Sequence, residues 1–135
     1  MDIDELIHKL ADDRGWALLY LKDEDAYRLT VSLPEERFQD VYVNFRRDEE
    51  EWYVATLWTV ISSVDDFNLT QPKELLAFNW RSMYGSLAIR DGEVVLVHNQ
   101  LADDADWNEI ARTVQHMART ADGIEKEIYG DLDEN

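Results

Sequence analysis

Apolar and polar residues follow the spacing typical of β-strands over much of the first half of the chain. Strands are predicted at 16–22, 27–33, 37–45 and 52–62, with polar turns between them. Pro34 ends the second strand, because proline has no backbone N–H for the hydrogen-bond ladder of a sheet. The pattern therefore predicts four consecutive strands.

Apolar residues repeat every three or four positions in three other segments, which predicts three helices. The first covers 3–10 and is followed by Gly15, a residue that favours the left-handed conformation of a helix C-cap. The second begins at Pro72, since proline fits the first turn of a helix. One side of this second helix carries Leu75, Leu76, Asn79 and Met83.

The third predicted helix is the longest and begins after Asp106, which resembles a capping box together with Glu109. Gly123 is a predicted break or kink in this helix. Residues 131–135 are expected to be a frayed acidic tail, which leaves 1–130 as one domain without linker or repeats. The apolar stripe of the helix consists of Trp107, Ile110, Ala111, Val114, Met117, Ala118 and Ala121.

The segment "SLAIRDGEVVLVHN" gives the sharpest local signal, a β-hairpin. Asp91-Gly92 predicts a type I′ turn, which needs positive φ at both residues, and Arg90 then faces Glu93. Cross-strand partners share one face of a hairpin. The inner face is predicted to carry Leu87, Ile89, Val94 and Leu96, and the outer face Arg90, Glu93, Val95 and Val97.

The strand at 52–62 has apolar residues on both faces, although the protein's own core needs only one of them. The open side of the sheet is therefore predicted to be polar over one half and apolar over the other, which indicates contact with another chain. The core face is predicted to carry Trp52, Val54, Trp58 and Val60. The predicted partner-binding residues are Tyr53, Leu57, Ile61, Val95 and Val97.

Two alternatives to this assignment of faces remain open at the level of the sequence. Trp52 and Trp58 are equally suited to be the anchors that a partner buries, because tryptophan is enriched at the centre of interfaces. A helix or loop of the same chain is also able to cover the second apolar face.

The order of elements is helix, four strands, helix, two strands, helix, that is α-β-β-β-β-α-β-β-α. Consecutive strands with few helices between them favour an antiparallel sheet. The predicted fold class is therefore α+β, with helices packed mainly on one face of the sheet.

The charge is strongly one-sided, with 30 acidic and 13 basic residues and a net charge of −17. Binding to nucleic acid or to anionic membrane is not expected, since both need lysine and arginine against phosphate. Short carboxylates in place of lysine indicate a halophilic source; an acidic adaptor or chaperone and a mimic of DNA phosphates are the other interpretations. The chain contains no cysteine, no signal peptide pattern and no apolar run of about 20 residues, so a cytoplasmic protein is expected.

Catalytic and metal-binding motifs are absent from the sequence. Asp103, Asp104 and Asp106 suggest calcium, but the glycine and glutamate that an EF-hand loop requires are missing, and helix capping explains the cluster. His8 and His116 are predicted to be solvated, and His98 to be a core histidine without catalytic role. We therefore predict no catalytic residue, no metal and no cofactor.

The order of elements and the segment "LLAFNWRSMYGSLAIRDGEVVLVHNQLADDADWNEIARTVQHMARTAD" resemble the type III secretion chaperone-like fold. The nearer likeness is to the YbjN-type group of regulators, with Gln100-Leu101 in place of a "PL"-like pair before the long helix. The four strands before the middle helix are more than the minimal secretion chaperone has.

The resemblance implies a small, acidic, usually dimeric protein that is not an enzyme. It also implies binding of extended client segments on hydrophobic patches, as the secretion chaperones do. The predicted function is a non-catalytic protein-binding module, chaperone-like or a regulatory adaptor, that acts as a homodimer through apolar sheet surface. Its partner is a protein client or a second copy, with no small-molecule substrate identified. The alternative is a small enzyme whose acid and base are not visible in the linear sequence.

Overall fold

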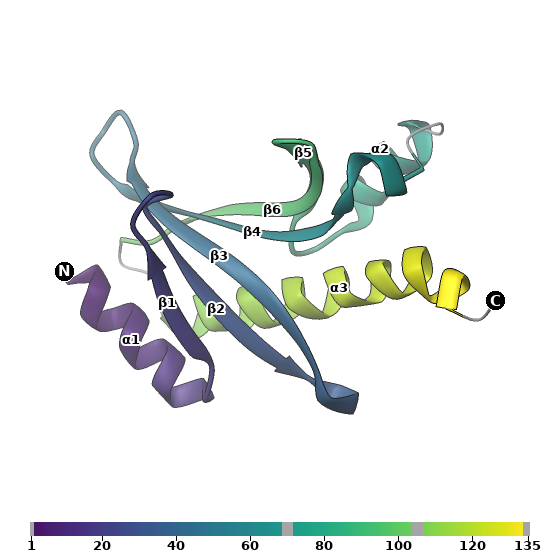
Figure 1. The fold of residues 1–135 in the computed structure, drawn as a ribbon. Helices are drawn as coiled ribbons and strands as arrows, with labels where there is room; N and C mark the ends of the chain where they lie inside the picture. The colour runs from purple at the N-terminus through teal and green to yellow at the C-terminus, as the bar shows by residue number, and fades with distance from the viewer. Residues whose placement is uncertain (1, 69–71, 104–106, 134–135) are drawn as a thin grey trace.

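The computed structural model describes residues 2–68, 72–103 and 107–133. These residues form a six-stranded antiparallel sheet and three α-helices (Figure 1). The helices are α1 (Ile3–Arg14), α2 (Pro72–Arg81) and α3 (Trp107–Asp133). The strands are β1 (Ala17–Leu21), β2 (Ala26–Leu33), β3 (Arg37–Arg47), β4 (Tyr53–Ser63), β5 (Ser86–Arg90) and β6 (Glu93–Leu101).

The strands are ordered β1-β2-β3-β4-β6-β5 across the sheet, and each neighbouring pair is antiparallel. The first four strands follow chain order, as short turns between consecutive strands allow. Helix α2 then connects β4 to the edge strand β5, and β6 returns to pair with β4. The predicted α+β class and order of elements are confirmed.

Local interactions define both ends of α1, and the predicted C-cap at Gly15 is confirmed. The Asp2 side chain accepts a hydrogen bond from the Glu5 N–H at 3.2 Å, which caps the start of α1. Gly15 ends the helix with φ of 70°, the left-handed conformation that glycine adopts without strain.

A hydrogen bond joins α1 to β2: the Tyr27 hydroxyl donates to the Asp4 carboxylate at 3.0 Å. Burial, and after it this bond, raise the pKa of Tyr27 to about 12.

Helices α1 and α3 lie on the same side of the sheet, where α3 runs beneath the central strands (Figure 1). Alanines on α3 face the sheet and are fully buried, so the helix backbone approaches the strands closely. This side holds the main core, in which Leu29, Val41, Val43, Leu57, Leu96, Val114 and Met117 are fully buried.

A polar network pins the C-terminal half of α3 to β3. Arg37 donates from both Nε and Nη2 to Asp122, each at 2.7 Å, and Asp122 is almost completely buried. Gln39 donates to the Thr59 hydroxyl at 2.7 Å and to Glu125 at 3.4 Å. These bonds replace the contacts with water that the buried polar groups lose on folding, and they join α3 to the sheet.

Two expectations about α3 are corrected. The helix runs unbroken through Gly123 to Asp133, so the predicted break is wrong and helical structure enters the segment expected to fray. A Cβ at Gly123 would meet nothing within 4 Å, and an exposed glycine costs a long, well-packed helix only about 1 kcal/mol. The capping role predicted for Asp106 lies outside the described residues.

The hairpin of β5 and β6 has the predicted register. Asp91 and Gly92 have φ of 50° and 80°, and Arg90 is the Cα partner of Glu93. The Arg90 guanidinium lies 4.9 Å from the centre of the Trp58 ring and 3.8 Å from the Asp91 carboxylate. Arg90 therefore covers an aromatic ring on the open face of the sheet.

The predicted assignment of faces is wrong for β4. Leu57 and Ile61 are buried in the main core beneath α3, and Tyr53 packs against the edge of that core. The other side chains of this strand, Val54, Trp58 and Val60, point to the open face. Register is the physical reason, because Leu57 is paired with Val43 and cross-strand partners share a face.

Candidate protein-binding surfaces

The largest exposed apolar side chains of the described residues gather on helix α2. Leu76, Trp80 and Met83 are 69%, 89% and 83% exposed. Leu76 and Trp80 are one helical turn apart and therefore lie on one side of α2, and Met83 follows just after the helix ends. Ile89, on the neighbouring strand β5, is 62% exposed. We call these four residues the α2 patch.

Hydrogen bonds between helix and strand hold the α2 patch in place. The Asn79 side chain accepts from the Leu87 N–H at 2.7 Å and donates to the Leu87 carbonyl at 3.4 Å. These bonds satisfy backbone groups on an edge strand that has no neighbour on that side. Asn79 thereby fixes α2 against β5.

An apolar groove of about 390 Å³ runs between α2 and β5. Its wall carries Leu76 from the α2 patch, so the groove and the patch form one continuous surface. The residues lining it are Phe67, Pro72, Leu75, Leu76, Asn79, Leu87, Ala88, Ile89 and Val94.

The local charge of this surface differs from that of the whole protein. Residues 72–89 contain Lys73 and Arg81 against one acidic residue, Glu74, whereas the chain as a whole has a net charge of −17. A surface of this kind avoids most of the repulsion that two acidic proteins would otherwise feel on approach.

The open face of the sheet carries a second candidate surface. Register places Arg28, Tyr42, Trp58 and Val97 in one row across β2, β3, β4 and β6. The Tyr42 and Trp58 rings stack at 5.4 Å with an interplanar angle of 15°. The Arg90 guanidinium also packs on Trp58, which is only 6% exposed.

A groove of about 390 Å³ passes over this row from β3 to β5. Val95 and Val97 lie on its floor, on the open face predicted from the hairpin. Of the five predicted partner-binding residues, the structure thus brings these two together, while Tyr53, Leu57 and Ile61 are on the helix-covered side. The residues lining the groove are Glu24, Asn44, Arg46, Thr56, Trp58, Ala88, Ile89, Arg90, Val95 and Val97.

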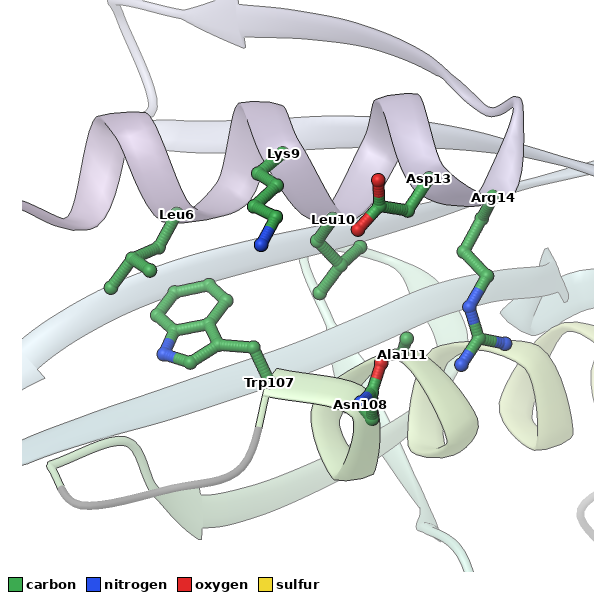
Figure 2. Close-up of a pocket in the computed structure, with 8 residues that line it drawn as sticks. All are labelled: Leu6, Lys9, Leu10, Asp13, Arg14, Trp107, Asn108 and Ala111. Atoms are coloured by element: carbon green, nitrogen blue, oxygen red, sulfur yellow. The ribbon is translucent and has the colours of Figure 1, made fainter.

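A smaller cleft of about 200 Å³ separates α1 from the start of α3 (Figure 2). Figure 2 shows the Lys9 and Arg14 side chains extending from α1 toward Trp107 and Asn108 on α3. Asp13 stands beside them, so the charges in the cleft are mixed. Among the described residues that line this cleft, none carries a buried polar side-chain atom without a hydrogen-bond partner.

Titratable groups with perturbed pKa values often mark an enzyme's active site. Burial raises the pKa of Glu125 and lowers that of His98. Glu125 belongs to the network around Gln39 and Arg37 and does not line the three grooves described above. Its environment is that of a structural carboxylate between α3 and the sheet.

Two of the three histidines differ in their surroundings. His8 is exposed and bonds the Asp4 carbonyl at 2.7 Å, as expected for a solvated residue. His116 is half-buried and stacks on Tyr84 with 4.5 Å between the ring centres, so the expectation of a solvated side chain is wrong there.

Of the three aspartates considered for calcium, only Asp103 belongs to the described residues, and its carboxylate accepts a hydrogen bond from the Tyr53 N–H. Asp104 and Asp106 lie outside the described residues.

No family model and no curated protein matches this chain. Ten solved chains match this structure, among them the following two. One is the ExsC-ExsE complex, with a TM-score of 0.64 and 18% identity over 95% of this chain and 97% of that chain. The other is YbjN, a putative transcription regulator from E. coli, with a TM-score of 0.62 and 12% identity over 93% and 90%. The predicted likeness in fold is confirmed.

The α2 patch was missed by sequence reasoning, which placed Leu76 and Met83 on the same side as Leu75 and Asn79. The available signal was a second apolar set at 76, 80 and 83, which includes Trp80.

No helix among the described residues combines the length and apolar character needed to span a bilayer.

Proposed function

We propose that this protein is a non-catalytic protein-binding module, chaperone-like or a regulatory adaptor, that works as a homodimer. The observation that carries the proposal is the α2 patch, where Leu76 and Trp80 are exposed one helical turn apart and Met83 is exposed just after the helix ends. Neighbouring apolar side chains that are this exposed, on a highly charged protein, mark a contact with another protein.

A second copy of the chain suits this surface. A twofold contact places the same patch of both copies face to face, so the patch must complement itself. It contains both a protruding side chain, Trp80, and an apolar groove beside it lined by Leu75 and Leu87. In the proposed dimer Trp80 of each copy enters the groove of the other.

The comparisons support a binding role without naming a partner. The ExsC structure is of a complex with ExsE, and YbjN is described as a putative regulator. A fold that holds another protein in one case provides surfaces of the kind proposed here. No observation on Glu125, His98 or the α1–α3 cleft favours the alternative of a small enzyme.

The test compares two substitutions of exposed aromatic residues. Trp80→Ser should give a folded monomer, while Phe38→Ser should leave the dimer intact, because Phe38 is 64% exposed on β3 away from the patch. Light scattering coupled to gel filtration gives the mass, and far-UV circular dichroism confirms folding. A Trp80→Ser protein that remains dimeric would remove α2 from the interface.

A further inference from the structure

Three aromatic rings join the end of the α2 patch to the body of the protein. Tyr84 follows directly after Met83 of the patch, and its ring stacks on that of His116 from α3. The two ring centres are 4.5 Å apart, and the interplanar angle is 6°. The ring of His98, from β6, has its centre 6.5 Å from that of Tyr84. We call these three rings the tyrosine stack.

The backbone beside the tyrosine stack has a restricted geometry. Gly85 has φ of 102°, and a Cβ there would stand 2.8 Å from the Leu96 side chain. The chain therefore passes closely over β6 at this point. His98 is the Cα partner of Leu57, so it lies on the face of the sheet that α3 covers. The tyrosine stack is thereby a tie between the α2 patch and the helix-covered side of the sheet.

Tyr84 has open space on two sides. A cleft of about 360 Å³ lies between the end of α2 and α3, and one of about 340 Å³ lies between the end of β6 and α3. Tyr84 lines both clefts, so its ring has room to leave the stack without displacing the core. Among the described residues, the charged groups that line the two clefts are Arg81 and Arg112 against Glu109.

His98 is the member of the stack whose charge the surroundings oppose. Burial lowers the pKa of His98, and its partner on β4, Leu57, is apolar and fully buried. The ion pairs within the described part of the chain include none to His98. A proton on His98 therefore enters a desolvated site beside two arginines and one glutamate, which costs free energy.

We propose that the tyrosine stack is an acid-sensitive latch, which holds the α2 patch against α3 at neutral pH and releases Tyr84 when His98 takes up a proton. His116 does not act in this way, because a protonated imidazole is attracted to the face of the tyrosine ring on which it stacks. Release of Tyr84 loosens the neighbouring Met83 and so weakens the homodimer. This last step rests on the proposed function and specifies the regulation of the same surface.

The pH range follows from the direction of the shift. The pKa of His98 is lower in the closed latch than the ordinary value of 6.5, so the released state takes up the proton first. The latch is therefore closed above pH 6.5 and opens as the pH falls below that value.

Other charges of the protein respond to acid in the opposite direction. Lowering the pH reduces the net charge of −17 and so relieves self-repulsion. Burial raises the pKa of Glu125, so the proton that this carboxyl takes up also favours the folded state. Loosening in acid that is confined to residues 82–87 therefore distinguishes the latch from both effects.

Hydrogen–deuterium exchange of the full chain, read by mass spectrometry and corrected for intrinsic rates, measures the opening at about pH 7.5 and 5.5. Protection of residues 82–87 should fall by about threefold or more in acid, while that of the central strand at 41–45 should not fall. His98→Phe should abolish the fall, because a neutral ring keeps the contact at both pH values. His116→Phe should preserve it, as should the exposed change His8→Gln on α1.

His98→Gln is a second neutral variant in case His98→Phe does not fold, and circular dichroism checks both. No fall in the parent protein, or a fall that a folded, neutral variant at this position retains, would overturn the inference. The same exchange measurement on Trp80→Ser removes any contribution of association.

Light scattering at the two pH values separates the latch from the proposed dimer. A dimer whose mass and protection do not change with pH refutes only the latch. A monomer that loses protection in acid refutes only the dimer. A dimer of constant mass that loses protection refutes the link between them.

Discussion

The burial of β4 can be tested with two identical substitutions at Leu57 and Leu76. Leu57 is fully buried in the core, whereas Leu76 is 69% exposed on α2. Leu→Ala in a core costs about 2–5 kcal/mol, through lost transfer free energy and the cavity left behind. The same change at an exposed site stays within about 0.5 kcal/mol, apart from any effect on association.

Urea unfolding followed by circular dichroism measures both free energies of unfolding. With a slope of about 2 kcal/mol per molar urea, Leu57→Ala should lower the midpoint by about 1–2.5 M. Leu76→Ala should shift it by no more than about 0.3 M at low protein concentration, where association contributes little. A loss below about 1 kcal/mol at Leu57 would show that β4 presents this face to solvent or to a partner.

Three further predictions concern the turn, the pH dependence and the charge. Gly92→Val should lower the free energy of unfolding by about 1–3 kcal/mol, because a β-branched residue is strained at φ of 80°. The control Gly123→Ala, at an open helical position, should raise it by about 0.5–1 kcal/mol. Equal stabilities of the two variants in thermal or urea unfolding would refute the predicted turn. Burial raises the pKa of Glu125, so the folded protein loses stability as this carboxyl ionises when the pH rises above 4.5. Glutamine stays neutral, so Glu125→Gln should be more stable than the parent at pH 7 but not at pH 4. The melting temperature should rise between about 0.01 and 1 M KCl as the screening length falls from roughly 30 to 3 Å, and an unchanged value would remove the halophilic interpretation.

Local signals allowed most of the fold to be predicted. The hairpin register follows from Asp91-Gly92, because the two-residue turn leaves only one alignment of its strands. The helix starts and ends likewise depend on single residues such as Gly15. Such features are set within a few residues of sequence, where propensity and turn chemistry decide the conformation.

Periodicity alone did not predict the faces of β4, because it gives no preference when both faces are apolar. Leu57 is placed in the core by its pairing with Val43, which depends on the length of the turn before β4. Counting back from that turn would have placed Leu57 and Val43 on one face. The second determinant, the packing of α3 over β4, joins segments that are far apart in sequence.

The candidate sites were harder to predict than the fold. Val95 and Val97 were placed on the open face because Arg90 and Glu93 mark that side of the hairpin. The row of Arg28, Tyr42, Trp58 and Val97 depends on the pairing of four strands and has no signal within a short segment. A binding surface assembled from distant elements becomes visible only once the sheet is formed.

Sedimentation equilibrium of the unaltered protein tests the central claim most directly. A homodimer built on the α2 patch should show twice the 15.9 kDa of one chain at micromolar concentration in 1 M KCl. The dimer should weaken at low salt, because the two copies repel each other when their charges are not screened. A mass of 15.9 kDa at every salt and protein concentration would contradict the account.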